Sequence, residues 1–242
     1  MHTLYKNIYE GVILMPTINS FIRFLHASPG TPIVDIYTDG NLVIKDLAYH
    51  DTSEYLVTGP ENMHIQVYPS GTDTDPLLDT ELTIPPSETI TAAIIGAAPD
   101  ISLLPLYYTV AVRDNDDALL RFTNLSPRAS AVNLTIEDGA TLFSDVAYTQ
   151  VTDFQVIAPE TYSLQIFRAD EEERYLASGL VEVVPRYAYT VYAIGLTEGE
   201  PPVEIGYFND LIPYYTDEVR ETVFSKDTLQ TGNAPRINLL YK

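Results

Sequence analysis

Two neighbouring stretches decide the fold: residues 21–29, Phe-Ile-Arg-Phe-Leu-His-Ala-Ser-Pro, and residues 33–44, Ile-Val-Asp-Ile-Tyr-Thr-Asp-Gly-Asn-Leu-Val-Ile. In the first, Ile22 and Phe24 share one parity and Arg23 takes the other, which is typical of a strand with one buried face. The second contains Asp39-Gly40, a pair that tolerates the positive φ angles of a tight hairpin turn. Together they predict a strand followed by a β-hairpin.

The same pattern returns about one hundred residues later. Residues 20–106 align with residues 118–208, and Ile22-Arg23-Phe24 falls on Leu120-Arg121-Phe122. Tyr55 falls on Phe154 in the same alignment. The chain is therefore expected to divide into an N-terminal segment 1–19, a first repeat 20–112, a linker 113–117, a second repeat 118–208 and a C-terminal segment 209–242.

Each repeat is predicted to be all-β. Short runs with alternating apolar residues are separated by Gly, Pro, Asp and Asn, and about seven strands fit into each copy, which indicates a β-sandwich. The expected strands of the first copy are Phe21–His26, Ile33–Tyr37, Asn41–Ile44, Met63–Tyr68, Leu78–Ile84, Thr89–Ile95 and Ile101–Leu106. Helical periodicity is weak throughout, and its best candidate is the short stretch Thr216–Phe224.

The composition excludes several function classes. With 13 Lys plus Arg against 34 Asp plus Glu, the net charge of −21 argues against a nucleic-acid ligand and against an anionic membrane surface. The absence of cysteine removes disulfides, zinc thiolate sites and cysteine nucleophiles. Neither a membrane-spanning stretch nor a secretory leader is recognisable, so a protein that works outside the cell would have been processed or have arrived by another route.

The residues also resemble a known family. The His-Ala-Ser-Pro stretch at 26–29, Val-Asp-Ile-Tyr at 34–37 and Pro-Ser-Gly-Thr at 69–72 resemble the bacterial domain-of-unknown-function family 4397. The resemblance implies tandem immunoglobulin-like β-sandwiches on bacterial surface or secreted proteins, with no known reaction. The second copy departs from the pattern, because Asn124 replaces His26 and Asn133 replaces Asp35.

No enzyme chemistry is expected. His26 and Ser28 suggest a base and a nucleophile, but a strand-to-turn role is favoured because the second copy lacks the histidine. The four histidines have no metal-ligand spacing, and the acidic runs 73–75 and 114–117 favour solvated loops over calcium sites. Arg23 and Asp35 are expected to pair across adjacent strands. No cofactor is expected.

The two ends receive more weight than any motif. Both read as extended strands that could add to the open sheet edge of another copy and so build a filament. The leading hypothesis is a self-assembling structural protein, a fibre or coat on a bacterial cell or spore surface. The candidate contacts are Leu4, Tyr5, Ile8, Tyr9, Val12, Ile13, Leu14, Ile237, Leu239, Leu240 and Tyr241.

The alternative hypothesis is a monomeric surface module that binds carbohydrate or a protein partner. Tyrosine side chains are suited to both ligands, because the ring stacks and the hydroxyl forms hydrogen bonds. The candidate exposed tyrosines are Tyr49, Tyr55, Tyr107, Tyr108, Tyr214 and Tyr215.

Overall fold

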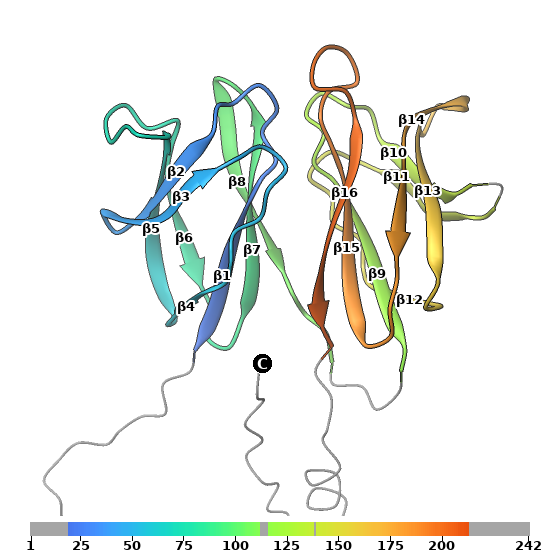
Figure 1. The fold of residues 1–242 in the computed structure, drawn as a ribbon, viewed down its shortest axis with the longest axis horizontal. Helices are drawn as coiled ribbons and strands as arrows, with labels where there is room; N and C mark the ends of the chain where they lie inside the picture. The colour runs from blue at the N-terminus through green and yellow to red at the C-terminus, as the bar shows by residue number, and fades with distance from the viewer. Residues whose placement is uncertain (1–18, 112–115, 138, 213–242) are drawn as a thin grey trace, which may run out of the picture.

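A computed structural model describes residues 19–111, 116–137 and 139–212. Within these ranges the chain forms sixteen strands and no helix. The strands make four four-stranded sheets, arranged as two β-sandwiches that lie side by side (Figure 1). The expected all-β fold with two tandem sandwich domains is confirmed. No described segment is an apolar helix of membrane-spanning length.

The first domain packs an outer sheet of order β3-β2-β5-β6 against an inner sheet of order β4-β1-β7-β8. Strand β1 pairs with β7 in parallel, whereas the other pairs are antiparallel. The strands are β1 (Ser20–His26), β2 (Val34–Thr38), β3 (Asn41–Leu47), β4 (Leu56–Thr58), β5 (Glu61–Pro69), β6 (Leu78–Ile84), β7 (Thr89–Ala97) and β8 (Asp100–Tyr107).

The second domain repeats this arrangement, with an outer sheet β11-β10-β13-β14 and an inner sheet β12-β9-β15-β16. Strand β9 again pairs in parallel with β15. The strands are β9 (Ala118–Asn124), β10 (Val132–Ile136), β11 (Thr141–Val146), β12 (Gln155–Ile157), β13 (Thr161–Arg168), β14 (Glu171–Glu182), β15 (Tyr187–Ile194) and β16 (Glu204–Leu211).

The strands expected from the sequence are all present in the first domain, and each domain adds one short strand that the pattern missed, β4 and β12. Asp39 and Gly40 both have positive φ, as the hairpin turn requires. Strand β16 runs to Leu211, beyond the expected end of the second repeat at residue 208. The candidate helix at Thr216–Phe224 lies outside the described residues.

Each sandwich has its own apolar core between its two sheets. Ile22, Phe24 and Ile65 are fully buried in the first domain, and Leu120, Phe122 and Leu164 occupy the corresponding core of the second. These residues lie on one parity of their strands, so burial of apolar surface fixes which face of each strand points inward.

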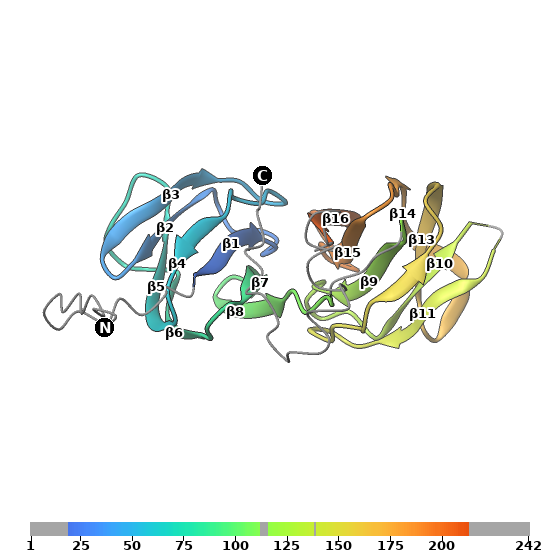
Figure 2. The same ribbon diagram turned by 90° about the horizontal axis from the view of Figure 1, so that it is seen from below.

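The two inner sheets face each other and bury a third apolar cluster between the domains (Figure 2). Its members come from both domains, which makes the four sheets successive layers of one molecule. They are Leu25, Ala27, Ala93, Ile95 and Leu106 from the first domain, and Leu125, Tyr192, Ile194 and Phe208 from the second.

In this interface, a large residue of the second domain lies beside a glycine of the same domain. Tyr192 on β15 lies opposite Gly206 on β16, whereas the same positions of the first domain hold Ala93 and Leu104. A Cβ atom on Gly206 would lie inside the Tyr192 ring and against Nε2 of His50. Gly206 therefore provides the space that the Tyr192 ring occupies.

The His-Ala-Ser-Pro turn is closed by the His26 ring. The ring is fully buried, and its Nε2 lies 3.0 Å from the Pro32 carbonyl while Nδ1 lies 3.4 Å from the Ser28 amide. In the second copy, Oδ1 of Asn124 accepts a hydrogen bond from the Ser126 amide at 3.1 Å. The imidazole and the carboxamide thus perform the same task in the two domains.

The expected pair between Arg23 and Asp35 is wrong. The two residues lie in different sheets, β1 and β2, and Asp35 accepts hydrogen bonds from the Asp46 and Gly71 amides at 2.8 and 2.9 Å. Burial opposes ionisation of Asp35, but these amides outweigh it and hold the pKa of the carboxyl below its usual value. Asp35 therefore stabilises the hairpin of its own sheet.

Gly206→Ala should destabilise the domain interface. We expect the free energy of unfolding to fall by about 1–3 kcal/mol, because the added methyl group displaces the Tyr192 ring from a packed contact. The measurement is denaturant unfolding. Gly59→Ala is the matched control, since its Cβ meets nothing within 4 Å, and equal stability of the two variants would contradict this packing.

His26 should make stability depend on pH. Burial lowers the pKa of His26, although the Pro32 carbonyl and Asp51 oppose this shift, so below about pH 6.5 the unfolded chain binds a proton that the folded chain resists. Stability contributed by the neutral ring is present above that pH and is lost as the pH falls below it.

The test is to compare unfolding free energies of the wild type and His26→Asn between about pH 7.5 and 5.5. Asparagine is the residue that the second copy has at this position, so the turn keeps its acceptor. The variant should show a shallower loss of stability on acidification. Parallel curves for the two proteins would rule out His26 as the source.

Candidate binding sites

The predicted subunit contacts in segments 1–19 and 209–242 lie outside the described residues, as do Tyr214 and Tyr215. Of the other candidate tyrosines, only Tyr107 is exposed, at 37% of its surface. Tyr55 donates to Asp210 at 2.8 Å and Tyr108 donates to the Leu211 carbonyl at 3.1 Å, so both hydroxyls serve the domain interface. Tyr49 is half-buried against His26.

The outer sheet of the second domain presents a polar face with two aromatic rings. Phe167 on β13 and Tyr175 on β14 pair directly, with ring centroids 6.3 Å apart in an edge-to-face arrangement, and Tyr175 is 49% exposed. Beside Phe167, a hollow of about 200 Å³ is lined by Asn133, Thr135 and Thr141. An aromatic wall thus adjoins neutral polar side chains.

These polar side chains retain hydrogen-bonding capacity. The Asn133 carbonyl oxygen accepts from the Asp145 amide, and the two threonine hydroxyls lie 3.4 Å apart. Within the described part of the chain, the Asn133 amide nitrogen and the Gln165 side chain form no hydrogen bond. Leu134 on β10 and Ile166 on β13 point into the core. Because side chains alternate along a strand, Asn133, Thr135 and Gln165 point outward.

The corresponding face of the first domain is different. Gln66, the counterpart of Gln165, donates to Asp79 at 2.8 Å, and His64 bonds the other oxygen of the same carboxylate at 2.7 Å. Its aromatic pair, Tyr37 and Tyr68, has centroids 5.3 Å apart. In the second domain Ser178 lies opposite Gln165, where Asp79 lies opposite Gln66, so this polar network is missing there.

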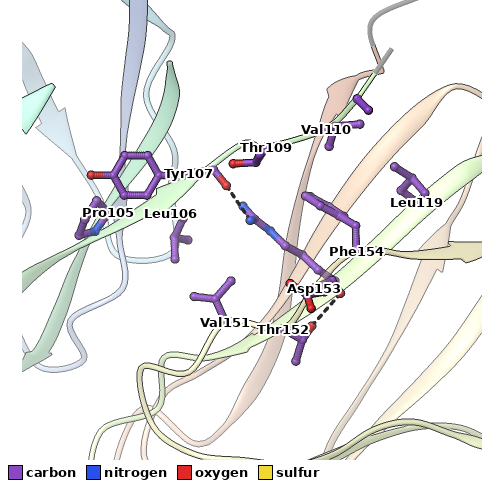
Figure 3. Close-up of a pocket in the computed structure, with 12 residues that line it drawn as sticks. Pro105, Leu106, Tyr107, Thr109, Val110, Leu119, Val151, Thr152, Asp153 and Phe154 are labelled. Carbon is purple, nitrogen blue, oxygen red and sulfur yellow. Dashed lines mark hydrogen bonds between the residues drawn. The ribbon is translucent and has the colours of Figure 1, made fainter. Parts of the chain in front are cut away.

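The larger cavity, of about 510 Å³, lies between the two domains. Its walls come from the end of β8, the segment that follows β8, strand β9 and the 151–154 segment (Figure 3). Leu106, Val110 and Phe154 are among its apolar residues, and Arg121 is its cation. Arg121 donates to the Tyr107 carbonyl at 2.7 Å.

An ion pair between the domains lies in the same interface. Nη2 of Arg23 is 2.9 Å from Oδ2 of Asp210, and the two side chains are only 9% and 12% exposed. The Arg23 guanidinium lies 4.5 Å from the Tyr55 ring centroid and 4.2 Å from that of Phe208. This is a nearly dry contact between β1 of one domain and β16 of the other.

In the structure, the His26 ring and the Ser28 hydroxyl do not bond each other. The Ser28 hydroxyl lies 2.7 Å from the Thr31 hydroxyl, and His26 contacts backbone groups. Among the described residues, no three His, Asp or Glu side chains converge on a metal-sized site. Asp116 forms an ion pair with Arg186 at 3.0 Å.

Sequence reasoning missed most of these residues. Asn133, Gln165, Phe167 and Tyr175 alternate with core positions, so their outward direction was readable, but the neighbours that they meet across strands were not. Asp210 lies beyond the expected end of the second repeat. Its partner Arg23 was expected to pair with Asp35 instead.

Comparisons with known proteins give a family and a distant fold likeness. No curated protein matches the chain by sequence. A family 26 carbohydrate-binding module of Eubacterium rectale Amy13K, solved with maltoheptaose, is 11% identical over 82% of this chain and 98% of its own, with a TM-score of 0.26. A streptococcal virulence factor described by its α-glucan binding is 6% identical over 73% of this chain and 92% of its own, with a TM-score of 0.23.

Both TM-scores are low, so these likenesses carry no argument about a ligand. The family model is more specific, because it covers the His-Ala-Ser-Pro turn, the hairpin and the first sandwich without interruption. Residues 20–135 match the domain of unknown function DUF4397, so this part of the chain contains a DUF4397 domain, and a β-domain of the same strand order follows it.

Proposed function

We propose that the protein is a non-catalytic surface module that binds carbohydrate on the outer sheet of its second domain. One observation carries this proposal: an aromatic pair, the half-buried Phe167 and the exposed Tyr175, adjoins a hollow whose polar groups are hydroxyls and amides. Sugars present apolar C–H faces beside hydroxyl groups, and such a combination of ring and neutral donors and acceptors complements both.

The electrostatics of the chain favour a neutral ligand on this face. Asn133, Thr135 and Gln165 carry no charge, and the net charge of −21 repels polyanions. Their side chains lie on adjacent strands of one sheet, so little conformational entropy is lost when they contact a ligand.

The first domain supplies an internal contrast. Its aromatic pair is present, but Asp79 binds both Gln66 and His64, so the polar groups of that face are already occupied. We therefore assign glycan binding to the second domain and a structural role to the equivalent face of the first.

The self-assembly expected from the sequence stays a prediction, because its contact residues lie outside the described ranges. It is tested by size-exclusion chromatography and negative-stain microscopy of the full chain beside a chain that begins at Asn19. Filaments formed by the full chain alone would support β-strand addition, and two monomeric proteins would exclude it. The surface location belongs to the same set of proposals.

Tyr175→Ala should weaken glycan binding about tenfold, which corresponds to about 1.4 kcal/mol, because the exposed ring supplies the stacking surface. A glycan array identifies a ligand for the wild type, and calorimetry then compares the variants. Tyr37→Ala, which removes a ring from the aromatic pair on the outer sheet of the first domain, is the control and should bind as the wild type does.

Two outcomes would contradict this assignment. One is a wild-type protein that retains no glycan, and the other is equal loss of binding in the Tyr175 and Tyr37 variants. A further variant, Gln165→Ala, should also weaken binding, whereas Gln66→Ala should not, because Gln66 already bonds Asp79.

A further inference from the structure

The two inner sheets hold a pair of arginines in equivalent places. Arg23 on β1 donates through Nε to Thr91 at 2.9 Å, and Arg121 on β9 donates through Nε to Thr190 at 2.9 Å. Each guanidinium also lies 4.5 Å from the centroid of an aromatic ring of its own domain, Tyr55 for Arg23 and Phe154 for Arg121. The two side chains are thus held in the same way.

What the opposite domain offers them is different. Arg23 meets the carboxylate of Asp210, whose other oxygen accepts from the Tyr55 hydroxyl. Arg121 donates to a neutral acceptor, the Tyr107 carbonyl, and forms no ion pair with a described residue, although the charge of Asp210 acts on it from a distance. The strand register explains this difference. Asp210 lies opposite Ala188 in the second domain, and Tyr108 bonds Thr89, the residue of the first domain that is equivalent to Ala188. Tyr108 therefore stands at the position of Asp210 but has no carboxylate.

The charges around the two arginines therefore do not balance. Arg23 and Arg121 are 8% and 6% exposed, and Asp210, the carboxylate that acts on both, makes its direct ion pair with Arg23. Burial lowers the pKa of Arg121 to about 10, so the side chain stays charged at neutral pH. A buried cation that no carboxylate contacts directly is unfavourable, and an anion that enters the site would relieve this.

The cavity beside Arg121 has room for such an anion. Its volume is about 510 Å³, and Leu106, Val110, Leu119 and Val151 give it apolar walls. The carboxylate of Asp153 stands on the same lining and repels groups of high negative charge. This favours a singly charged carboxylate on an apolar body over a phosphate.

We propose that the cavity between the domains binds an exogenous ligand through a carboxylate, which takes toward Arg121 the place that Asp210 takes toward Arg23. This site is separate from the glycan surface, because it lies between the inner sheets whereas Phe167 and Tyr175 lie on an outer sheet.

Hexanoate is the probe, and hexanamide, of the same shape without the charge, is its control. We expect hexanoate to shift the Nε–H resonance of Arg121 in the full chain and to leave that of Arg23 unchanged, since Asp210 already occupies Arg23. Hexanamide should bind at least tenfold more weakly, and inorganic phosphate should not compete with hexanoate.

Arg121→Gln should weaken hexanoate binding at least tenfold. Because loss of Arg121 could also disturb the fold, a second pair of variants keeps it. Tyr108→Asp places a carboxylate at the position equivalent to Asp210 and should abolish binding, whereas Tyr108→Asn, equal in size and uncharged, should retain it.

Equal binding of hexanoate and hexanamide would overturn the proposal, as would stronger competition by phosphate or identical behaviour of the two Tyr108 variants. None of these results bears on the Tyr175 surface, so this site and the proposed function fail or stand separately.

Discussion

The contact of Arg23 with Asp210 is the interaction on which the rest of the structure depends. It joins β1 of one sandwich to β16 of the other, and the guanidinium lies against the Tyr55 and Phe208 rings, with almost no water around it. A buried ion pair is unfavourable to break, because either partner alone would be left charged in an apolar surrounding. The pair therefore fixes how the two inner sheets meet.

Once the inner sheets are buried against each other, the remaining surfaces follow. The outer sheets become the broad exposed faces of the molecule, and the gap that the interface leaves beside Arg121 becomes a cavity of about 510 Å³. Duplication supplied two equivalent arginines and two equivalent outer faces. Divergence then gave one arginine and one outer face a carboxylate partner: Asp210 binds Arg23, and Asp79 binds Gln66. Arg121 and Gln165, the equivalent residues of the second domain, have no such carboxylate partner among the described residues.

The sequence predicted the elements well, because alternation and the Asp-Gly turn are local signals. It placed seven of the eight strands of the first copy and predicted a second copy of the same all-β type. The sequence also contained a signal for the interface that the prediction did not use. In β7, Ile90 and Ile94 are apolar on one parity, and Ala93 and Ile95 are apolar on the other. This pattern is typical of a strand whose two faces are both buried.

Partners across space were beyond such reasoning. Arg23 was paired with Asp35 because the two stretches are neighbours along the chain, yet the sandwich places β1 and β2 in different sheets. The cavity at Arg121 depends on the contact between two domains, and the outer-face site depends on cross-strand register, which bulges shift in β10 and β13. Neither quantity can be read from periodicity.

The docking of the two domains is tested most directly by ¹⁵N relaxation of backbone amides in the full chain. If the Arg23–Asp210 contact and the apolar cluster hold the inner sheets together, the amides of both domains report one rotational correlation time, that of a single body. Two different and shorter correlation times, one for each sandwich, would show that the domains tumble independently and would contradict the account.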